Sequence, residues 1–195
     1  MKKKLIIVRH GLTLANKFKI WNGVYADLPL LQEGKEEAWK VGQALRKFNI
    51  EVIYCSPLLR AQETAKHIVE AYSKPISVIT KNELRECDFG IAEGQKMEDV
   101  RKKYSLLIDK MYWGTKNTWE LSFPGGESKH ETFKRVNACI NGLWDSFFDC
   151  ALIVSHGGVM NALDIGWELH GLNYEHGTFN VIEYDTDTQK FVRIV

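Results

Sequence analysis

Two arginines and two histidines follow closely after three short apolar runs. They are Arg9 and His10 after residues 5–8, Arg60 after residues 52–55, and His156 after residues 151–154. A guanidinium group binds phosphate oxygens through paired hydrogen bonds. An imidazole with a pKa near ~6.5 is largely neutral at cellular pH, so one ring nitrogen can act as a nucleophile. No comparable cluster of carboxylates follows these runs. The residue types therefore predict a site for a compact dianion, of which phosphate is the obvious example.

The three apolar runs have the pattern of buried strands. Each is continuous rather than alternating, which is typical of strands that are covered on both faces, and residues 76–79 form a weaker fourth candidate. Between the runs, apolar residues recur at helical spacing in segments 38–48, 58–72 and 133–147. This alternation predicts an α/β fold, a three-layer sandwich around a mostly parallel sheet. Such sheets bind ligands beyond the carboxyl ends of their strands, where the four side chains above would meet.

The ends of two predicted helices carry capping signals. Ser56 precedes Pro57, so we predict that the Ser56 hydroxyl caps the helix that contains Arg60. The dipole of that helix would favour an anion near Arg60. Ser128 and Glu131 have the spacing of a capping box and follow directly after a Pro-Gly-Gly breaker.

Two other segments depart from the alternating pattern. The apolar segments 179–184 and 191–194 are separated by too few residues for a parallel crossover, so they predict an antiparallel C-terminal hairpin. Residues 94–126 are rich in aromatic side chains and fit a helical or loop lid insertion better than a sheet scaffold. Because the sequence shows no repeat or linker, we expect a single domain over residues 1–195.

Composition argues against several classes of protein. The 195 residues hold 26 Lys and Arg against 25 Asp and Glu, a net charge of +1, so no overall field favours nucleic acid or an anionic membrane. The hydrophobic content of 45% is that of a globular chain. The N-terminal apolar run is shorter than the ~7–15 residues of a secretory signal or the ~18 of a membrane span. Four widely spaced cysteines indicate reduced thiols rather than disulfides or a zinc site. We therefore expect a cytoplasmic protein.

Five blocks of sequence resemble the histidine phosphatase superfamily, whose fold is that of the phosphoglycerate mutases. The blocks are Arg9-His10-Gly11-Leu12-Thr13-Leu14-Ala15-Asn16, Ser56-Pro57-Leu58-Leu59-Arg60-Ala61-Gln62-Glu63-Thr64-Ala65, Leu84-Arg85-Glu86 with Gly90 and Glu93-Gly94, Pro124-Gly125-Gly126-Glu127-Ser128, and Ser155-His156-Gly157-Gly158-Val159. They follow the order of the family and cover most of the chain. The resemblance implies a phosphohistidine intermediate, with no metal and no cofactor.

The same resemblance implies a role for each site residue. His10 is the nucleophile, and Glu86 is the acid that protonates an alcohol leaving group. We expect the pKa of Glu86 to rise beside a phosphate dianion, so that the carboxyl holds a proton for the leaving oxygen and later accepts one from water. The phosphoryl oxygens would be held by Arg9, Asn16, Arg60 and His156.

The leaving-group pocket is predicted from the loop Trp21, Asn22, Gly23, together with Trp113 or Trp119 of the insertion. Aromatic walls suit sugar-like, nucleoside-like or aryl groups. Each of these aromatics is equally consistent with packing of the insertion onto the sheet. The remaining histidines follow no apolar run, and we expect solvated or structural positions for His67, His130, His170 and His176.

The superfamily contains both phosphatases and mutases. In this family, the mutases are longer chains that have a Thr-Gly pair after the nucleophile and basic residues in the insertion that hold a carboxylate. This chain instead has Asn22-Gly23 and an aromatic-rich insertion. The sequence therefore favours a hydrolase of small phosphorylated metabolites, similar to α-ribazole phosphate phosphatases and broad-specificity phosphomonoesterases. One alternative is cofactor-dependent phosphoryl transfer of the phosphoglycerate mutase type. The other is a regulatory module that binds phosphate without turnover, which the presence of both His10 and Glu86 disfavours.

Overall fold

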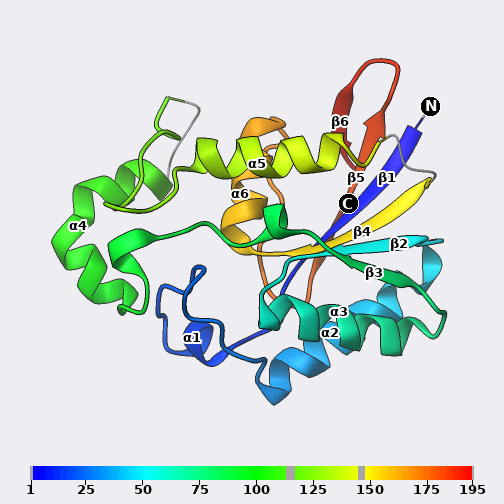
Figure 1. Cartoon of the computed structure of the whole chain (residues 1–195), viewed down its shortest axis with the longest axis horizontal. Helices are drawn as coiled ribbons and strands as arrows, with labels where there is room; N and C mark the ends of the chain where they lie inside the picture. Colours follow the sequence, from blue (N-terminus) through cyan, green and yellow to red (C-terminus); the bar gives the residue numbers. More distant parts are fainter. Residues whose placement is uncertain (1, 113–116, 145–147, 195) are drawn as a thin grey trace.

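The computed structural model describes residues 2–112, 117–144 and 148–194, which form a layered α/β sandwich (Figure 1). In this part of the chain the sheet has the strand order β3-β2-β4-β1-β5-β6. Its parallel strands are β1 (Lys2–Arg9), β2 (Val52–Cys55), β3 (Ser77–Thr80) and β4 (Cys150–Ser155). The antiparallel strands are β5 (Phe179–Asp185), beside β1, and β6 (Lys190–Arg193), beside β5. The predicted parallel sheet and C-terminal hairpin are both confirmed.

Helices cover both faces of the sheet (Figure 1). One face carries α2 (Gln32–Ala44) and α3 (Leu59–Tyr72), and the other carries α5 (Lys129–Asn141) and α6 (Gly157–Gly166). Successive side chains of β1 point to opposite faces. Leu5 and Ile7 therefore belong to the apolar cluster of α5 and α6, whereas Ile6 and Val8 belong to the cluster of α2 and α3. This double burial is the reason that the strand reads as a continuous apolar run.

A third, smaller apolar cluster lies beside the sandwich and contains residues of α4 (Met97–Tyr112). This helix bends at Tyr104, where the backbone leaves the helical region. Phe123 is fully buried in the cluster, and Trp21, from the loop after α1 (Leu14–Lys17), packs edge-on against it at 5.3 Å between ring centroids. Much of this cluster comes from residues 94–126, for which the role of a lid stays a prediction. Short 3₁₀ helices occur at η1 (Leu45–Lys47), η2 (Asn82–Leu84) and η3 (Gly90–Ala92).

One predicted helix cap is confirmed and the other is wrong. The Ser128 hydroxyl accepts a hydrogen bond from Glu131 N at 3.1 Å, and the Glu131 carboxylate accepts one from Ser128 N at 2.8 Å. Helix α3, by contrast, begins at Leu59, and its N-cap residue Leu58 makes no side-chain cap hydrogen bond. Ser56 does not cap it, because the helix begins three residues later; the Ser56 hydroxyl instead contacts Leu58 N and Nε2 of His156.

All four cysteines are free thiols, and Cys55, Cys87 and Cys150 are buried. Burial raises the pKa of Cys55 to about 12, so this thiol carries no thiolate at neutral pH. Among the helices of the described ranges, none combines the length and the apolarity that crossing a bilayer demands.

Candidate active site

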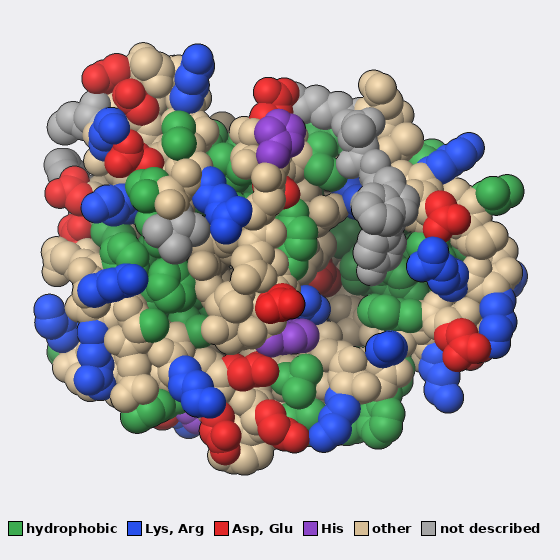
Figure 2. All heavy atoms as spheres, turned by 180° about the vertical axis from the view of Figure 1, so that it is seen from behind, with side chains coloured by type: hydrophobic (Ala, Val, Ile, Leu, Met, Phe, Trp, Pro, Cys, Tyr) green, Lys and Arg blue, Asp and Glu red, His purple; other side chains and the backbone are tan. Residues whose placement is uncertain are grey.

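A cavity of about 340 Å³ lies beyond the carboxyl ends of β1 and β4. Polar side chains from the strand ends line one part of it, and apolar side chains from the α4 cluster line another. Figure 2 shows a hollow near the middle of this side of the molecule, with histidine, acidic and basic side chains at its edge. The predicted site residues that line the cavity are Arg9, His10, Asn16, Trp21, Asn22 and Glu86.

His10, the predicted nucleophile, is held in one tautomer. Its side chain is only 3% exposed, and Nδ1 lies 2.8 Å from the carbonyl oxygen of Gly11. Because a carbonyl only accepts hydrogen bonds, Nδ1 carries the proton and Nε2 keeps its lone pair. Burial lowers the pKa of His10 well below its usual value, and the charges of Arg60 and Arg9 lower it further. The imidazole is therefore neutral at cellular pH.

His156 lies beside His10, with 5.1 Å between the ring centroids. Its Nε2 is 2.7 Å from the Ser56 hydroxyl, and its buried Nδ1 has no hydrogen-bond partner. The Ser56 oxygen accepts the backbone N–H of Leu58 at 3.3 Å, so its own proton is available for Nε2. A Ser56 proton donated to Nε2 leaves the ring proton of His156 on Nδ1; the residue is fully buried and is not among those that line the cavity. Burial, followed by the charge of Arg60, lowers the pKa of His156 well below its usual value.

The two predicted phosphate-binding arginines lie at different depths. Arg9 lines the cavity and donates from Nη1 to the carbonyl of Tyr174 at 2.8 Å. A Cβ at Gly157 would approach its guanidinium to 3.3 Å, so the glycine allows close packing. Arg60 is fully buried behind the cavity wall; it donates to the Gly23 carbonyl at 2.8 Å and contacts Asp27 at 3.3 Å. Arg60 thus holds the loop of the predicted leaving-group pocket and adds positive charge near both histidines.

Glu86, the predicted acid, is 5% exposed and lines the same cavity as His10. Its Oε1 accepts the backbone N–H of Cys87 at 2.8 Å, and its Oε2 accepts that of Gly158 at 3.2 Å. An ideal Cβ at Gly158 would come within 2.5 Å of the carboxylate. The glycine at the start of α6 therefore lets the carboxylate lie directly against the backbone.

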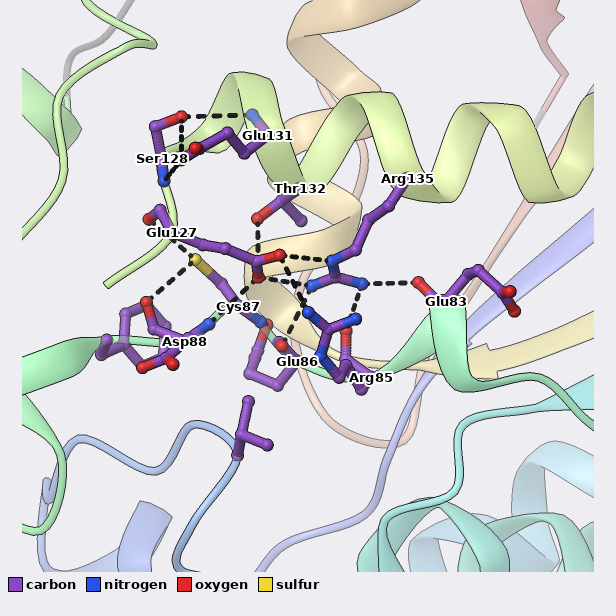
Figure 3. Close-up of polar contacts among 12 residues, drawn as sticks. Glu83, Arg85, Glu86, Cys87, Asp88, Glu127, Ser128, Glu131, Thr132 and Arg135 are labelled. Atoms are coloured by element: carbon purple, nitrogen blue, oxygen red, sulfur yellow. Dashed lines mark hydrogen bonds and ion pairs between the residues drawn. The ribbon is translucent and has the colours of Figure 1, made fainter. Parts of the chain in front are cut away.

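The backbone that carries Glu86 is held by a pair of residues that the sequence reasoning did not select. Arg135 on α5 donates to the carbonyls of Glu86 at 3.0 Å, Arg85 at 2.9 Å and Glu83 at 2.5 Å (Figure 3). It also binds both carboxylate oxygens of Glu127, at 2.7 and 2.8 Å. We call Arg135 and Glu127 the carbonyl clamp.

Glu127 completes the clamp from the other side. Its carboxylate accepts the backbone N–H of Asp88 at 3.2 Å and pairs with Arg85 at 3.1 Å (Figure 3). Burial alone would raise the pKa of Glu127, but the hydrogen bonds and the charge of Arg135 hold it below its usual value. Glu127 stood in a matched sequence block, but nothing local distinguishes Arg135, because the carbonyls that it binds lie about fifty residues away along the chain.

The remaining predicted pocket residues are Asn16, the loop residues Asn22 and Gly23, and the two tryptophans of the insertion. Asn16 accepts the Thr13 hydroxyl at 2.7 Å through Oδ1, which leaves its amide nitrogen as the donor to the cavity. Both polar atoms of the Asn22 side chain are buried without a hydrogen-bond partner. Gly23 contributes its carbonyl to Arg60. Trp119 stacks on His130 at 4.3 Å and does not line the cavity, while Trp113 lies outside the described residues.

His176 was expected to be solvated or structural, but its ring lies 5.6 Å from that of His10. Burial, with the charge of Arg9, lowers the pKa of His176 to about 3. The His176 ring borders a second, more open cavity of about 650 Å³. Arg9 and Tyr174 line both cavities. His176 comes from an irregular loop, so no periodicity in the sequence could have placed it here.

Comparison with known proteins supplies the family. The model of the histidine phosphatase superfamily (branch 1) matches residues 5–195. The chain belongs to this superfamily. A relative from Bartonella bacilliformis is described as a 2,3-bisphosphoglycerate-dependent phosphoglycerate mutase. It is 31% identical to this chain, and the alignment covers 90% of this chain and 85% of the relative. Phosphoserine phosphatase 1 of Hydrogenobacter thermophilus is 32% identical, with 82% of this chain and 74% of the relative covered.

The fold of the histidine phosphatases is also confirmed at the structural level. The α-ribazole phosphatase of Shigella flexneri superposes with a TM-score of 0.77 at 25% identity, covering 98% of this chain and 95% of that one. The relatives of this chain therefore include proteins described as phosphatases and a protein described as a mutase.

Proposed function

We propose that this protein is a phosphomonoester hydrolase that acts on a small phosphorylated metabolite through a phosphohistidine on His10, without a metal. The observation that carries the proposal is the tautomer of His10. Its Nδ1–H is committed to the Gly11 carbonyl, so Nε2 offers a lone pair in a cavity that also contains Glu86. A neutral imidazole of this kind is nucleophilic without metal activation.

The proposed first half-reaction transfers the phosphoryl group to the protein. Nε2 of His10 forms a bond to phosphorus while the bond from phosphorus to the alcohol oxygen breaks. Glu86 in its protonated form gives its proton to the leaving oxygen. Arg9, Arg60 and His156 stabilise the negative charge that spreads over the phosphoryl oxygens.

The second half-reaction restores the protein. Water attacks phosphorus, the bond to Nε2 of His10 breaks, and Glu86 accepts a proton from the water. Inorganic phosphate then leaves, and both residues return to their starting protonation states. Two backbone N–H groups hold the Glu86 carboxylate through this cycle, which keeps the same oxygen atoms near the leaving group and then near the water.

A phosphoglycerate mutase is the second candidate, because the Bartonella bacilliformis relative carries that description. A mutase returns the phosphoryl group of phosphohistidine to a bound acid, whereas a phosphatase gives it to water. The two reactions share the first half-reaction, so they differ only in what attacks the intermediate. Product analysis therefore separates them.

The test uses p-nitrophenyl phosphate and a phosphometabolite panel in the presence of EDTA. We expect phosphate release by the wild type, trapping of acid-labile phosphate on the protein, and loss of both in His10→Ala and His10→Asn. Interconversion of phosphoglycerates without free phosphate would replace the hydrolase by the mutase. Binding of phosphate without turnover of any substrate would leave a regulatory module instead.

Glu86→Gln tests the assigned acid. We expect a kcat loss of about 100-fold or more on alkyl phosphates and a much smaller loss on aryl phosphates, whose leaving groups need no proton. Equal losses on both classes of substrate would remove Glu86 from this role.

A further inference from the structure

Lys129 brings a positive charge into the apolar part of the cavity. It is the first residue of α5 and lines the cavity together with Met97, Ile108 and Met111 of α4. Its ammonium group donates to the backbone carbonyl of Met111, near the end of α4. The side chain is half-buried. Removing an ammonium group from water is costly unless an anion compensates it.

No carboxylate of the described chain forms an ion pair with Lys129. The two acidic residues of the cavity have other partners, since Glu127 is bound by Arg135 and Glu86 accepts backbone N–H groups. Burial lowers the pKa of Lys129; the Cys87 thiol opposes this effect, but no carboxylate does so. The carbonyl of Met111 accepts one of its three donors, so the ammonium retains hydrogen-bonding capacity for a ligand.

The lysines of α4 do not duplicate this charge. Lys102, Lys103 and Lys110 are exposed and do not line the cavity. In the described ranges, the cations that do line it are Arg9, at the end of β1, and Lys129. If a substrate binds with its phosphate at His10 and its body among the apolar side chains, the end opposite the phosphate would lie beside Lys129.

We propose that Lys129 selects phosphomonoesters whose leaving group carries a carboxylate, which the ammonium group binds at the α4 end of the cavity. This inference rests on the proposed function and names its substrate class. A carboxylate fits better than a second phosphate, because one ammonium neutralises one negative charge. A dianion would leave excess negative charge in a cavity that already contains Glu86 and Glu127.

The experiment compares matched substrates that differ in the carboxylate. The pairs are 3-phosphoglycerate against glycerol 3-phosphate, and 4-carboxyphenyl phosphate against 4-carbamoylphenyl phosphate. We expect the wild type to prefer the carboxylate in kcat/KM by about 10- to 100-fold, the size of one hydrogen bond to a charged group. Lys129→Met should remove most of this preference, and Lys129→Arg should retain it. Lys134→Met is the matched control, because Lys134 is exposed on the same helix.

Several outcomes would overturn the assignment. They are a wild-type preference near one for both pairs, a preference that Lys129→Met leaves intact, and stronger selection of propanediol bisphosphate over its monophosphate than of either carboxylate. If Lys129→Met fails to fold, the wild-type preference and Lys129→Arg decide the question. Failure of the proposed function looks different, because the wild type would release no phosphate from any member. Calorimetric binding of the same pairs to His10→Ala, with and without Lys129→Met, then tests the lysine by itself.

Discussion

Arg135→Met is expected to impair catalysis through Glu86, although Arg135 contacts the backbone carbonyl of Glu86 and not its carboxylate. The guanidinium donates to three backbone carbonyls of the segment that carries the acid, those of Glu83, Arg85 and Glu86. It also pairs with the carboxylate of Glu127. Methionine preserves most of the apolar stem and removes all of these donors. The substitution therefore frees the segment without adding bulk.

The contacts determine the size of the expected loss. A buried carbonyl without its donor costs about 1–3 kcal/mol, and less where water can replace the donor, as at this clamp with the Arg135 side chain 13% exposed. Because Arg85 still pairs with Glu127, we expect about 2–4 kcal/mol in total, or a fall in Tm of about 5–12 °C for a domain of this size. A displacement of the Glu86 carboxylate by ~1 Å is enough to lower kcat about 100-fold.

The assay is a double-mutant cycle with Glu86→Gln, measured on an alkyl and an aryl phosphate. Arg135→Met alone should lower kcat on the alkyl phosphate far more than on the aryl phosphate. In the Glu86→Gln background it should lower kcat by no more than about 3-fold, because the acid is already absent. Losses that multiply in the double variant, or equal losses on both substrates, refute the reasoning. Arg101→Met, at an exposed ion pair on α4, controls for the change of charge.

Four further predictions concern the imidazoles and the glycine beside Glu86. Ser56→Ala removes the hydroxyl that places the proton of His156 on Nδ1, so kcat/KM for aryl phosphates should fall about 10- to 100-fold, and an unchanged value would contradict the assigned tautomer. Nitrogen-15 NMR should find His10 neutral with its proton on Nδ1 at pH 5.5, whereas a titration midpoint near 6.5 would contradict the effect of burial. Because the pKa of His10 is lower in the folded state than the ~6.5 of the unfolded chain, the unfolded chain binds more protons, and denaturation should show stability falling as the pH drops below ~6.5. Gly158→Ala should move the Glu86 carboxylate and reduce turnover of alkyl phosphates more than of aryl phosphates, with a small change in Tm, and a crystal structure with Glu86 unmoved would refute this.

Local patterns predicted much of the scaffold. Strands β1, β2 and β4 are buried on both faces, and that burial demands continuous apolar runs which are visible in any sequence. The capping box of α5 was equally visible, because its partners are three residues apart. Parallel strands bring their carboxyl ends to one edge, so the convergence of Arg9, His10 and His156 followed from the same runs.

The sequence by itself thus determined the layers of the sandwich, the family and the residues that stand after each strand, since these depend on spacing along the chain. Only the tertiary structure decided which groups support those residues. Ser56 meets His156 across 100 positions, and Arg135 meets the Glu86 carbonyl across 49. His176 and Lys129 reach the active-site region from a loop and from the start of a helix. Periodicity reports burial and secondary structure, whereas the partner of a polar group depends on how distant segments pack, and that information is absent from any local pattern.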